Sequence, residues 1–107
     1  ESNKDKLYDA FADNSVTQLG IVMPGYQKHS FSKEYIMVDG NKSLKYMLTY
    51  SIHENEQAVR VSITLCGVLI YVTRLKLLYE FNFGDGEQEY LQTSEIFNNV
   101  IASIRFL

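Results

Sequence analysis

The chain has 107 residues, of which 46% are hydrophobic and 13% aromatic, and its formal net charge is −3. This content argues against an intrinsically disordered chain, and the length predicts a single domain, residues 1–107, that buries its own core. A mild acidic balance without a basic stripe argues against a nucleic-acid-binding protein. The one cysteine, Cys66, excludes an internal disulfide and a cysteine-rich zinc site.

The N-terminal part predicts a short helix followed by a strand. In residues 2–15, Leu7, Ala10 and Phe11 have helical spacing, and the polar "DNS" is typical of a helix end. Residues 17–22 then predict a strand. It is expected to end at a turn in "MPGY", which holds the only proline of the chain.

The middle of the chain predicts antiparallel strands. A strand in "KEYIMV" is expected to close at Asp39-Gly40, a dipeptide favoured in tight hairpin turns. Apolar and polar residues then alternate strictly in "LKYMLTYSI" (44–52) and in "AVRVSITL" (58–65), which the polar loop "HENEQ" joins. This pattern predicts a hairpin with one face on the core and the other in water.

A further strand region runs from residue 68 to residue 83. Gly67 predicts a turn or bulge before "VLIYV". That strand could be central, or it could lie at a sheet edge and pair with a second copy. "RLKLLYEFNF" alternates again. Because one strand over 68–83 would be unusually long, we expect it to bend near Thr73 or to be two strands.

The C-terminal residues predict an amphipathic helix over 93–106, which Thr93 or Ser94 could cap. Its apolar positions are expected to form one stripe buried on the sheet: Ile96, Phe97, Val100, Ile101 and Ile104. Together the elements predict an α+β fold. It is a mostly antiparallel sheet of five to six strands, packed by a short N-terminal helix and by this C-terminal amphipathic helix.

The stretch "NFGDGEQEY", residues 82–90, has the composition of a ligand site. Asp85, Glu87 and Glu89 could offer three oxygens to a metal ion, but an EF-hand calcium loop aligned on Gly86 keeps only Asp85 in place. We therefore expect no metal and no cofactor here. The stretch predicts instead a solvated junction between the last strand and the closing helix, with backbone freedom from its two glycines.

No arrangement of residues in the sequence points to catalysis. His53 lies near Glu54 and Glu56, a group that a small hydrolase could use, but a histidine in a polar loop more often faces solvent. Cys66 has apolar neighbours and no adjacent positive charge, which is typical of a small core residue rather than of a reactive thiolate. The sequence favours a protein that is not an enzyme.

The eight tyrosines are a further unusual feature of the composition. Four of them lie on predicted strand faces: Tyr46, Tyr50, Tyr71 and Tyr79. Tyrosine suits half-buried sheet surfaces. The other interpretation is a binding surface, since tyrosine gives a large contact area at low entropic cost. Exposed tyrosines next to Met23, Met37 or Met47 would favour a partner or an apolar ligand.

The last third of the chain resembles the end of PsbP-like domains. "LLYEFNF", an acidic loop and "EIFNNVIASIRF" are similar to a late strand that leads into a closing helix with the pattern F-x-x-I-x-x-S-F/I. The matching positions are Phe97, Ile101, Ser103 or Ile104, and Phe106. The resemblance implies a non-enzymatic α/β/α sandwich around an antiparallel sheet. Relatives include photosystem accessory proteins, small regulators of nuclear transport and exported bacterial lipoproteins, which share little beyond binding a protein partner.

The expected function is therefore a non-catalytic protein-interaction or accessory domain, extracytoplasmic in a bacterium, with a cytoplasmic location left open. The longest apolar run, "CGVLIYV", is too short for a membrane-spanning helix. A chain that opens on Glu1 leaves room for a removed leader or lipid anchor. The alternative is a small apolar-ligand or lipid-binding domain with a pocket between sheet and helix. The protein partner and the oligomeric state stay open.

Overall fold

The structure, a computed structural model, describes residues 3–23, 25–53 and 60–107. In chain order its elements are α1 (Asn3–Val22), β1 (Gln27–Val38), β2 (Asn41–Ile52), β3 (Val61–Val72), β4 (Leu77–Gly86) and α2 (Tyr90–Ala102). The four strands form one antiparallel sheet in the order β1-β2-β3-β4. The predicted α+β class is confirmed, whereas the predicted count of five to six strands is wrong.

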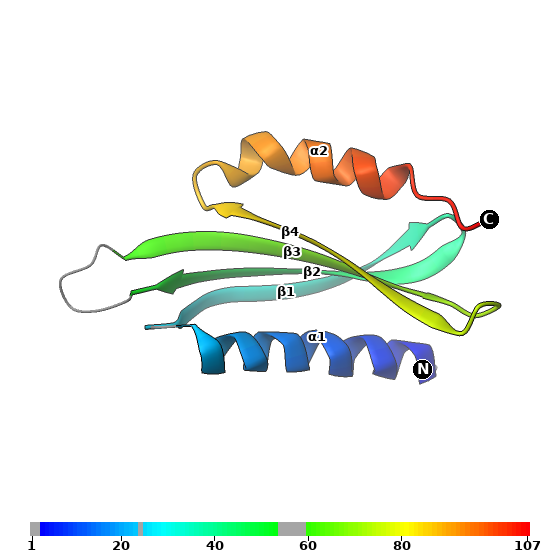
Figure 1. Cartoon of the computed structure of the whole chain (residues 1–107), viewed down its shortest axis with the longest axis horizontal. Coiled ribbons are helices and arrows are strands. Elements are labelled where there is room, and N and C mark those ends of the chain that lie inside the picture. The colour runs from blue at the N-terminus through cyan, green and yellow to red at the C-terminus, as the bar shows by residue number, and fades with distance from the viewer. Residues whose placement is uncertain (1–2, 24, 54–59) are drawn as a thin grey trace.

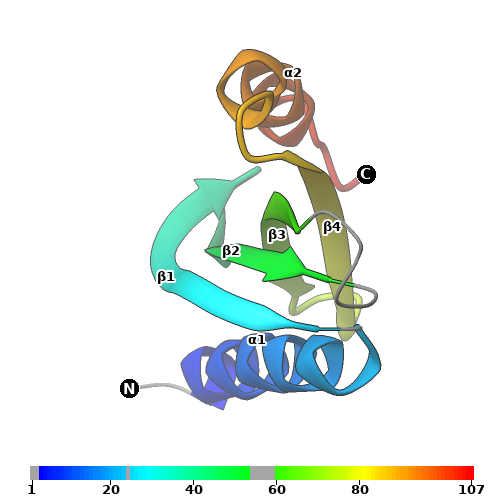
Figure 2. The same cartoon turned by 90° about the vertical axis from the view of Figure 1, so that its left-hand side faces the viewer.

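The two helices lie on opposite faces of this sheet (Figures 1 and 2). Alternation along the central strands β2 and β3 gives each face its own core, because successive side chains point to opposite sides. The core beneath α1 consists of Tyr8, Ala12, Leu44, Tyr46 and Leu69. The core beneath α2 consists of Val38, Val68, Ile70, Val72 and Ile101. Because both its faces are covered, β3 is apolar almost throughout.

The predicted strand over residues 17–22 is wrong, because these residues continue α1 for a total of 20 residues. Tyr8 and Ala12 are buried one turn apart, and Leu19 extends the same face two turns later as a half-buried side chain. The supposed stop at residues 13–15 is an exposed helical turn, in which Asp13 accepts a hydrogen bond from Lys33 at 3.0 Å. Docking on the sheet therefore overrides the local β-propensity.

The two predicted hairpins are found. Asp39 and Gly40 have φ angles of 48° and 79°, as a two-residue turn of type I′ requires. Strands β2 and β3 pair without interruption from Ser43 opposite Ile70 to Ile52 opposite Val61. Most of the predicted loop "HENEQ" lies outside the described residues. The predicted turn in "MPGY" is described only in part, because Pro24 lies outside them as well.

The turn or bulge predicted at Gly67 is wrong. Gly67 lies in the middle of β3, opposite Tyr46 of β2, and an added Cβ would stand 2.3 Å from the Tyr46 ring. "VLIYV" is therefore part of a central strand and is not at an edge. The predicted break near Thr73 is confirmed, since β3 ends at Val72 and β4 begins at Leu77. The corrections at residues 17–22 and at Gly67 each remove one strand from the predicted count.

Tyr8 closes the end of the β2–β3 ladder. The last paired residues are Ser43 and Ile70, and the next residues on each strand, Lys42 and Tyr71, are not paired with each other. The Tyr8 hydroxyl lies between them, donating to the Lys42 carbonyl oxygen at 2.6 Å and accepting from the Tyr71 N–H at 2.8 Å. Burial raises the pKa of Tyr8, so the hydroxyl stays protonated and can serve as a donor.

Candidate interaction surface

The two edges of the sheet differ in how well they are protected. Strand β1 has a register shift between Lys28 and Ser30, and its Lys33 forms ion pairs with Asp9 and Asp13 of α1. Bulges and lysines are features that hinder pairing of an edge with another strand. Strand β4 is the other edge, and it pairs with β3 from Leu77 to Gly86 without a shift. Figure 2 shows β4 at the right-hand side of the sheet, with α2 above and α1 below.

The register tells which backbone groups of β4 face outward. The Glu87 N–H donates to the Ser62 carbonyl oxygen. In an antiparallel pair every second residue bonds to the same neighbouring strand, so the odd-numbered residues of β4 direct their N–H and C=O groups to β3. The N–H and C=O groups of the even-numbered residues point to the free edge: Leu78, Glu80, Asn82 and Gly84. Within the described residues no strand pairs with that edge.

Apolar side chains of α2 flank this edge. Phe97, Ile101 and Ile104 pack on the sheet as predicted, but Ile96 and Val100 are 67% and 51% exposed, so their predicted burial is wrong. Lys45 of β2 donates to the Asn98 side-chain oxygen of α2 at 3.5 Å. The side of α2 that carries Asn98 therefore lies toward the central strand β2. Ile96 and Val100 are each about 200° around the helix from Asn98. They therefore face the β4 side.

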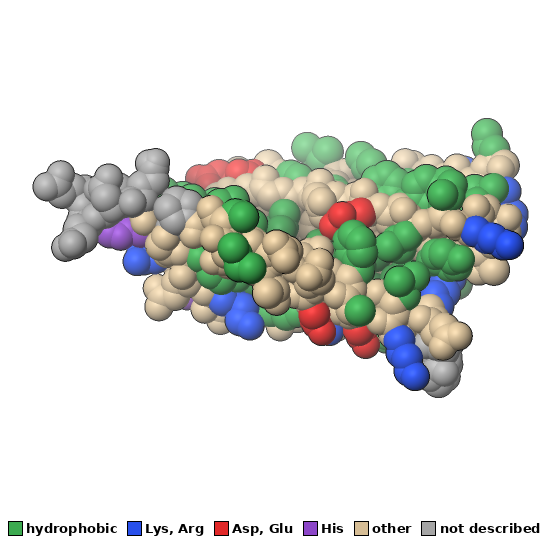
Figure 3. Space-filling view, turned by 60° about the horizontal axis from the view of Figure 1, so that its bottom comes forward, with side chains coloured by type: hydrophobic (Ala, Val, Ile, Leu, Met, Phe, Trp, Pro, Cys, Tyr) green, Lys and Arg blue, Asp and Glu red, His purple; other side chains and the backbone are tan. Residues whose placement is uncertain are grey.

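Further apolar side chains are exposed near the N-terminal end of β4. Leu75 lies in the β3–β4 turn and is 40% exposed, and Leu77 opens β4 and is 51% exposed. Figure 3 shows apolar side chains gathered over the right-hand half of the face that it presents. We call the outward backbone of β4 together with Leu75, Leu77, Ile96 and Val100 the β4 edge surface. Between Leu77 and Gly84 the strand carries a single charge, Glu80.

Charges of opposite sign lie at the two ends of the β4 edge surface. Arg74 and Lys76 are in the turn before β4, and Asp85, Glu87 and Glu89 lie at the strand's end and beyond it. Arg74 donates to the Phe106 and Leu107 carbonyl oxygens at 2.7 and 2.8 Å. Lys76 and Glu87 form no ion pair with any described residue. The edge is therefore basic at its start and acidic at its end.

The acidic stretch is the predicted junction between the last strand and the closing helix, although the helix begins at Tyr90 and not at residue 93. Neither glycine has a positive φ, so the predicted need for their backbone freedom is wrong. Asp85 organises the junction instead. Its Oδ1 accepts from the Gly86 N–H and its Oδ2 from the Thr93 hydroxyl, both at 2.8 Å. Thr93 is thus in the first turn of α2 and does not cap it.

Replacing Asp85 by alanine should lower the free energy of unfolding by about 1 kcal/mol, because a hydrogen bond within the end of β4 and another between β4 and the first turn of α2 are lost. Urea denaturation measures this change. Gln88→Ala is the control, since the Gln88 side chain is exposed and makes no hydrogen bond with a described residue. Equal losses in both variants would contradict the role that we assign to Asp85.

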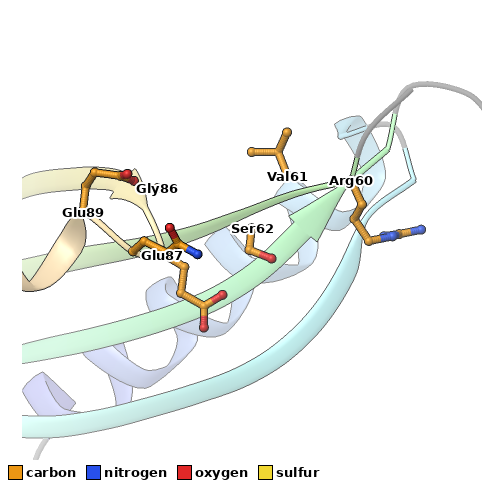
Figure 4. Close-up of a pocket in the computed structure, with 7 residues that line it drawn as sticks. Arg60, Val61, Ser62, Gly86, Glu87 and Glu89 are labelled. Carbon is orange, nitrogen blue, oxygen red and sulfur yellow. The ribbon is translucent and has the colours of Figure 1, made fainter. Parts of the chain in front are cut away.

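A surface hollow of about 370 Å³ lies beside this junction, between the start of β3 and the residues after β4. Figure 4 shows Arg60 directing its guanidinium away from Glu87 and Glu89. That guanidinium donates to the Ser51 hydroxyl at 3.0 Å and to the Gly25 carbonyl oxygen at 3.2 Å. Within the described residues no group of three acidic, histidine or cysteine side chains is arranged to hold a metal ion.

Cys66 and His29, two of the described residues with potential for catalysis, make structural contacts. Cys66 is buried, as predicted, and burial raises the pKa of its thiol. His29 contacts the Ser51 hydroxyl at 3.0 Å, an arrangement that a hydrolase would use, but Ser51 is fully buried and also bonded to Arg60. Glu54 and Glu56, the predicted neighbours of His53, lie outside the described residues.

The four tyrosines proposed as a binding surface do not form one exposed surface. Tyr46 and Tyr50 are buried, at 2% and 5% exposure, and the Tyr46 hydroxyl donates to Glu80 at 3.1 Å. Tyr71 is half-buried on the α1 face of the sheet. Tyr79 is half-buried on the α2 face, with its ring 5.0 Å from that of Phe106. Their role in the described structure is packing.

Sequence reasoning missed the residues of the β4 edge surface. Ile96 and Val100 were expected in the core. Each is followed directly by another apolar residue, Phe97 or Ile101, so the apolar stripe of the helix is wider than its contact with the sheet. The width of this stripe was the signal that some of its residues would stay exposed. The edge position of β4 left no signal in the sequence, since strand order depends on the pairing of distant segments.

No protein-family model, curated protein or solved structure matches this chain. The geometry of the chain itself is therefore the basis for any statement about function. In the part of the chain that the structure describes, neither helix is apolar enough over its length to cross a membrane.

Proposed function

We propose that this chain is a non-catalytic protein-interaction domain that binds a partner along the β4 edge surface. The observation that carries the proposal is a strand edge of 10 residues that no described strand covers, without bulge, proline or lysine, beside the exposed Ile96 and Val100. Such an edge offers backbone donors and acceptors to an added strand, and apolar side chains next to it add affinity. An unprotected edge of this kind is a liability unless a partner covers it.

The burial of nucleophilic side chains supports the non-enzymatic part of this proposal. Two of the described nucleophiles, Ser51 and Cys66, are fully buried and so out of reach of a substrate. The resemblance to PsbP-like domains adds the expectation of an accessory domain from an exported bacterial protein. That expectation rests on the sequence of the last strand and helix alone.

Blocking the outward backbone of β4 tests the proposal. Peptides of 10 residues, the length of β4, are selected from a random display library against the protein immobilised at sparse density. Asn82→Pro removes an outward N–H and leaves the bonds to β3 in place, which proline tolerates on an edge strand. We expect selected peptides to lose at least about tenfold in affinity for this variant, measured by biolayer interferometry.

The matched control is Met37→Pro. The two-residue hairpin turn makes Val38 and Asn41 a bonded pair, so the N–H of Met37 faces outward from the β1 edge. Peptides that bind at β4 should retain their affinity for this variant. A library that yields no binder, or binders that Asn82→Pro leaves unaffected, would rule out the β4 edge surface as the binding site.

A second candidate function is the binding of a small apolar ligand. It is favoured by a hollow of about 220 Å³ between the start of α1 and the end of β3, lined in part by Leu7 and Tyr71. This hollow is smaller than the roughly 300–1,000 Å³ typical of ligand pockets. It would therefore hold only a small molecule, and the β4 edge surface remains the stronger candidate.

A further inference from the structure

We infer that the partner at the β4 edge surface is a second copy of this chain, which pairs its own β4 antiparallel to the first. This inference rests on the proposed function and names its partner. The resulting dimer has a two-fold axis through the paired β4 strands and a continuous sheet of eight strands.

The positions of the outward backbone groups restrict the register of such a pair. Even-numbered residues of one β4 must bond to even-numbered residues of the other, since these carry the outward N–H and C=O groups. A two-fold axis at Phe81 pairs Glu80 with Asn82, and Leu78 with Gly84, of the second copy. This register uses nearly the whole length of β4, because Phe81 is close to its centre.

Side-chain pairing favours the axis at Phe81 over its neighbour at Glu80. An axis at Glu80 would set that carboxylate directly opposite itself, and like charges opposite one another destabilise a sheet. With the axis at Phe81, Tyr79 lies opposite Phe83 of the second copy and the two Phe81 rings are opposite each other. These aromatic side chains already form the α2 face of β4, where the Phe83 ring lies 5.4 Å from that of Phe97. Aromatic cross-strand pairs stabilise antiparallel strands.

The charges at the ends of the edge identify a second copy as the occupant. An antiparallel two-fold pair brings the basic start of one β4 next to the acidic end of the other, and does so twice. Lys76 then lies near Glu87 of the second copy, and neither residue forms an ion pair with a described residue in the single chain. The centre of the edge carries only Glu80, which in this register lies opposite Asn82 of the second copy and not opposite the other Glu80.

The same axis places both α2 helices on one face of the joined sheet. Ile96 and Val100, which face the β4 side of α2, then lie toward the second copy. Pairing of β4 with the β1 edge of another copy would instead propagate without closure. The register shift and the ion-paired Lys33 of β1 work against that alternative.

Analytical ultracentrifugation of the full chain from about 1 µM to about 1 mM tests the inference. We expect a monomer–dimer equilibrium for the wild type and a monomer for Asn82→Pro, with an unchanged far-ultraviolet circular dichroism spectrum. Lys76→Glu should weaken the dimer roughly tenfold, since two ion pairs become repulsive contacts. The double variant Lys76→Glu with Glu87→Lys should restore it, because the swap keeps opposite charges in contact.

A wild type that stays monomeric throughout would overturn the inference. If the selected peptides still lose affinity for Asn82→Pro in that case, the proposed function stands and only the identity of the partner is wrong. A dimer that persists in Asn82→Pro, or a double variant as weak as Lys76→Glu alone, would also overturn the inference, since the contact would then lie elsewhere or have another register.

Discussion

Alanine at position 67 should lower the free energy of unfolding by about 2 kcal/mol, although alanine normally stabilises a strand relative to glycine. The reason is the Tyr46 ring on the neighbouring strand. A Cβ at position 67 would lie 2.3 Å from Cζ and 2.6 Å from the hydroxyl oxygen of Tyr46. The ring is 2% exposed and its hydroxyl is bonded to Glu80, so it cannot move aside without breaking contacts.

Urea denaturation of Gly67→Ala measures this loss, and Gly84→Ala provides the matched control. Gly84 is also a strand glycine without a positive φ, but the nearest atom to an added Cβ is a Leu65 methyl at 3.5 Å, an ordinary contact. Gly84→Ala should leave stability within about 0.5 kcal/mol of the wild type or raise it. Equal stability of the two variants would mean that the Tyr46 ring does not occupy the space above Gly67.

Replacing Tyr8 by phenylalanine should lower the free energy of unfolding by about 2–3 kcal/mol, although it removes only one oxygen atom. Tyr8 is fully buried, and its hydroxyl holds the Lys42 carbonyl and the Tyr71 N–H at the end of the β2–β3 ladder. Phenylalanine would leave both backbone groups without this partner in an apolar setting, and the desolvation of such groups is not recovered.

Thermal and urea denaturation of Tyr8→Phe should be compared with Tyr26→Phe. The Tyr26 hydroxyl is buried as well, but it has no hydrogen-bond partner among the described residues. Its removal should leave stability unchanged or raise it by up to about 1 kcal/mol, because an unsatisfied polar group leaves the interior. A neutral Tyr8→Phe would show that the hydroxyl does not bridge the two strands.

Local patterns in the sequence predicted the hairpins for a definite reason. Alternation in residues 44–52 and 58–65 reports which side chains share a face, and Asp39-Gly40 meets the positive φ angles of its turn. The amphipathic C-terminal helix follows from the same logic with a period of 3.6 residues. These elements were predictable because each depends on neighbours in the sequence.

Two errors arose where distant contacts decide the local structure. Residues 17–22 have the composition of a strand, yet they are helical because α1 continues along the sheet with Tyr8, Ala12 and Leu19 on its inner face. Gly67 was interpreted as a turn residue, yet it lies within β3, where its lack of a side chain leaves room for the Tyr46 ring of β2. Neither contact can be read from the residues on either side.

The sequence by itself determined the α+β class, the antiparallel hairpins, the closing helix and the burial of Cys66, since periodicity and turn residues encode them locally. Only the tertiary structure decided that β4 lies at an edge of the sheet, that Ile96 and Val100 stay exposed beside it, and that the four tyrosines pack in the cores instead of forming one exposed surface. Strand order and helix orientation are set by side chains that meet across the sheet. The β4 edge surface exists only after those contacts have formed.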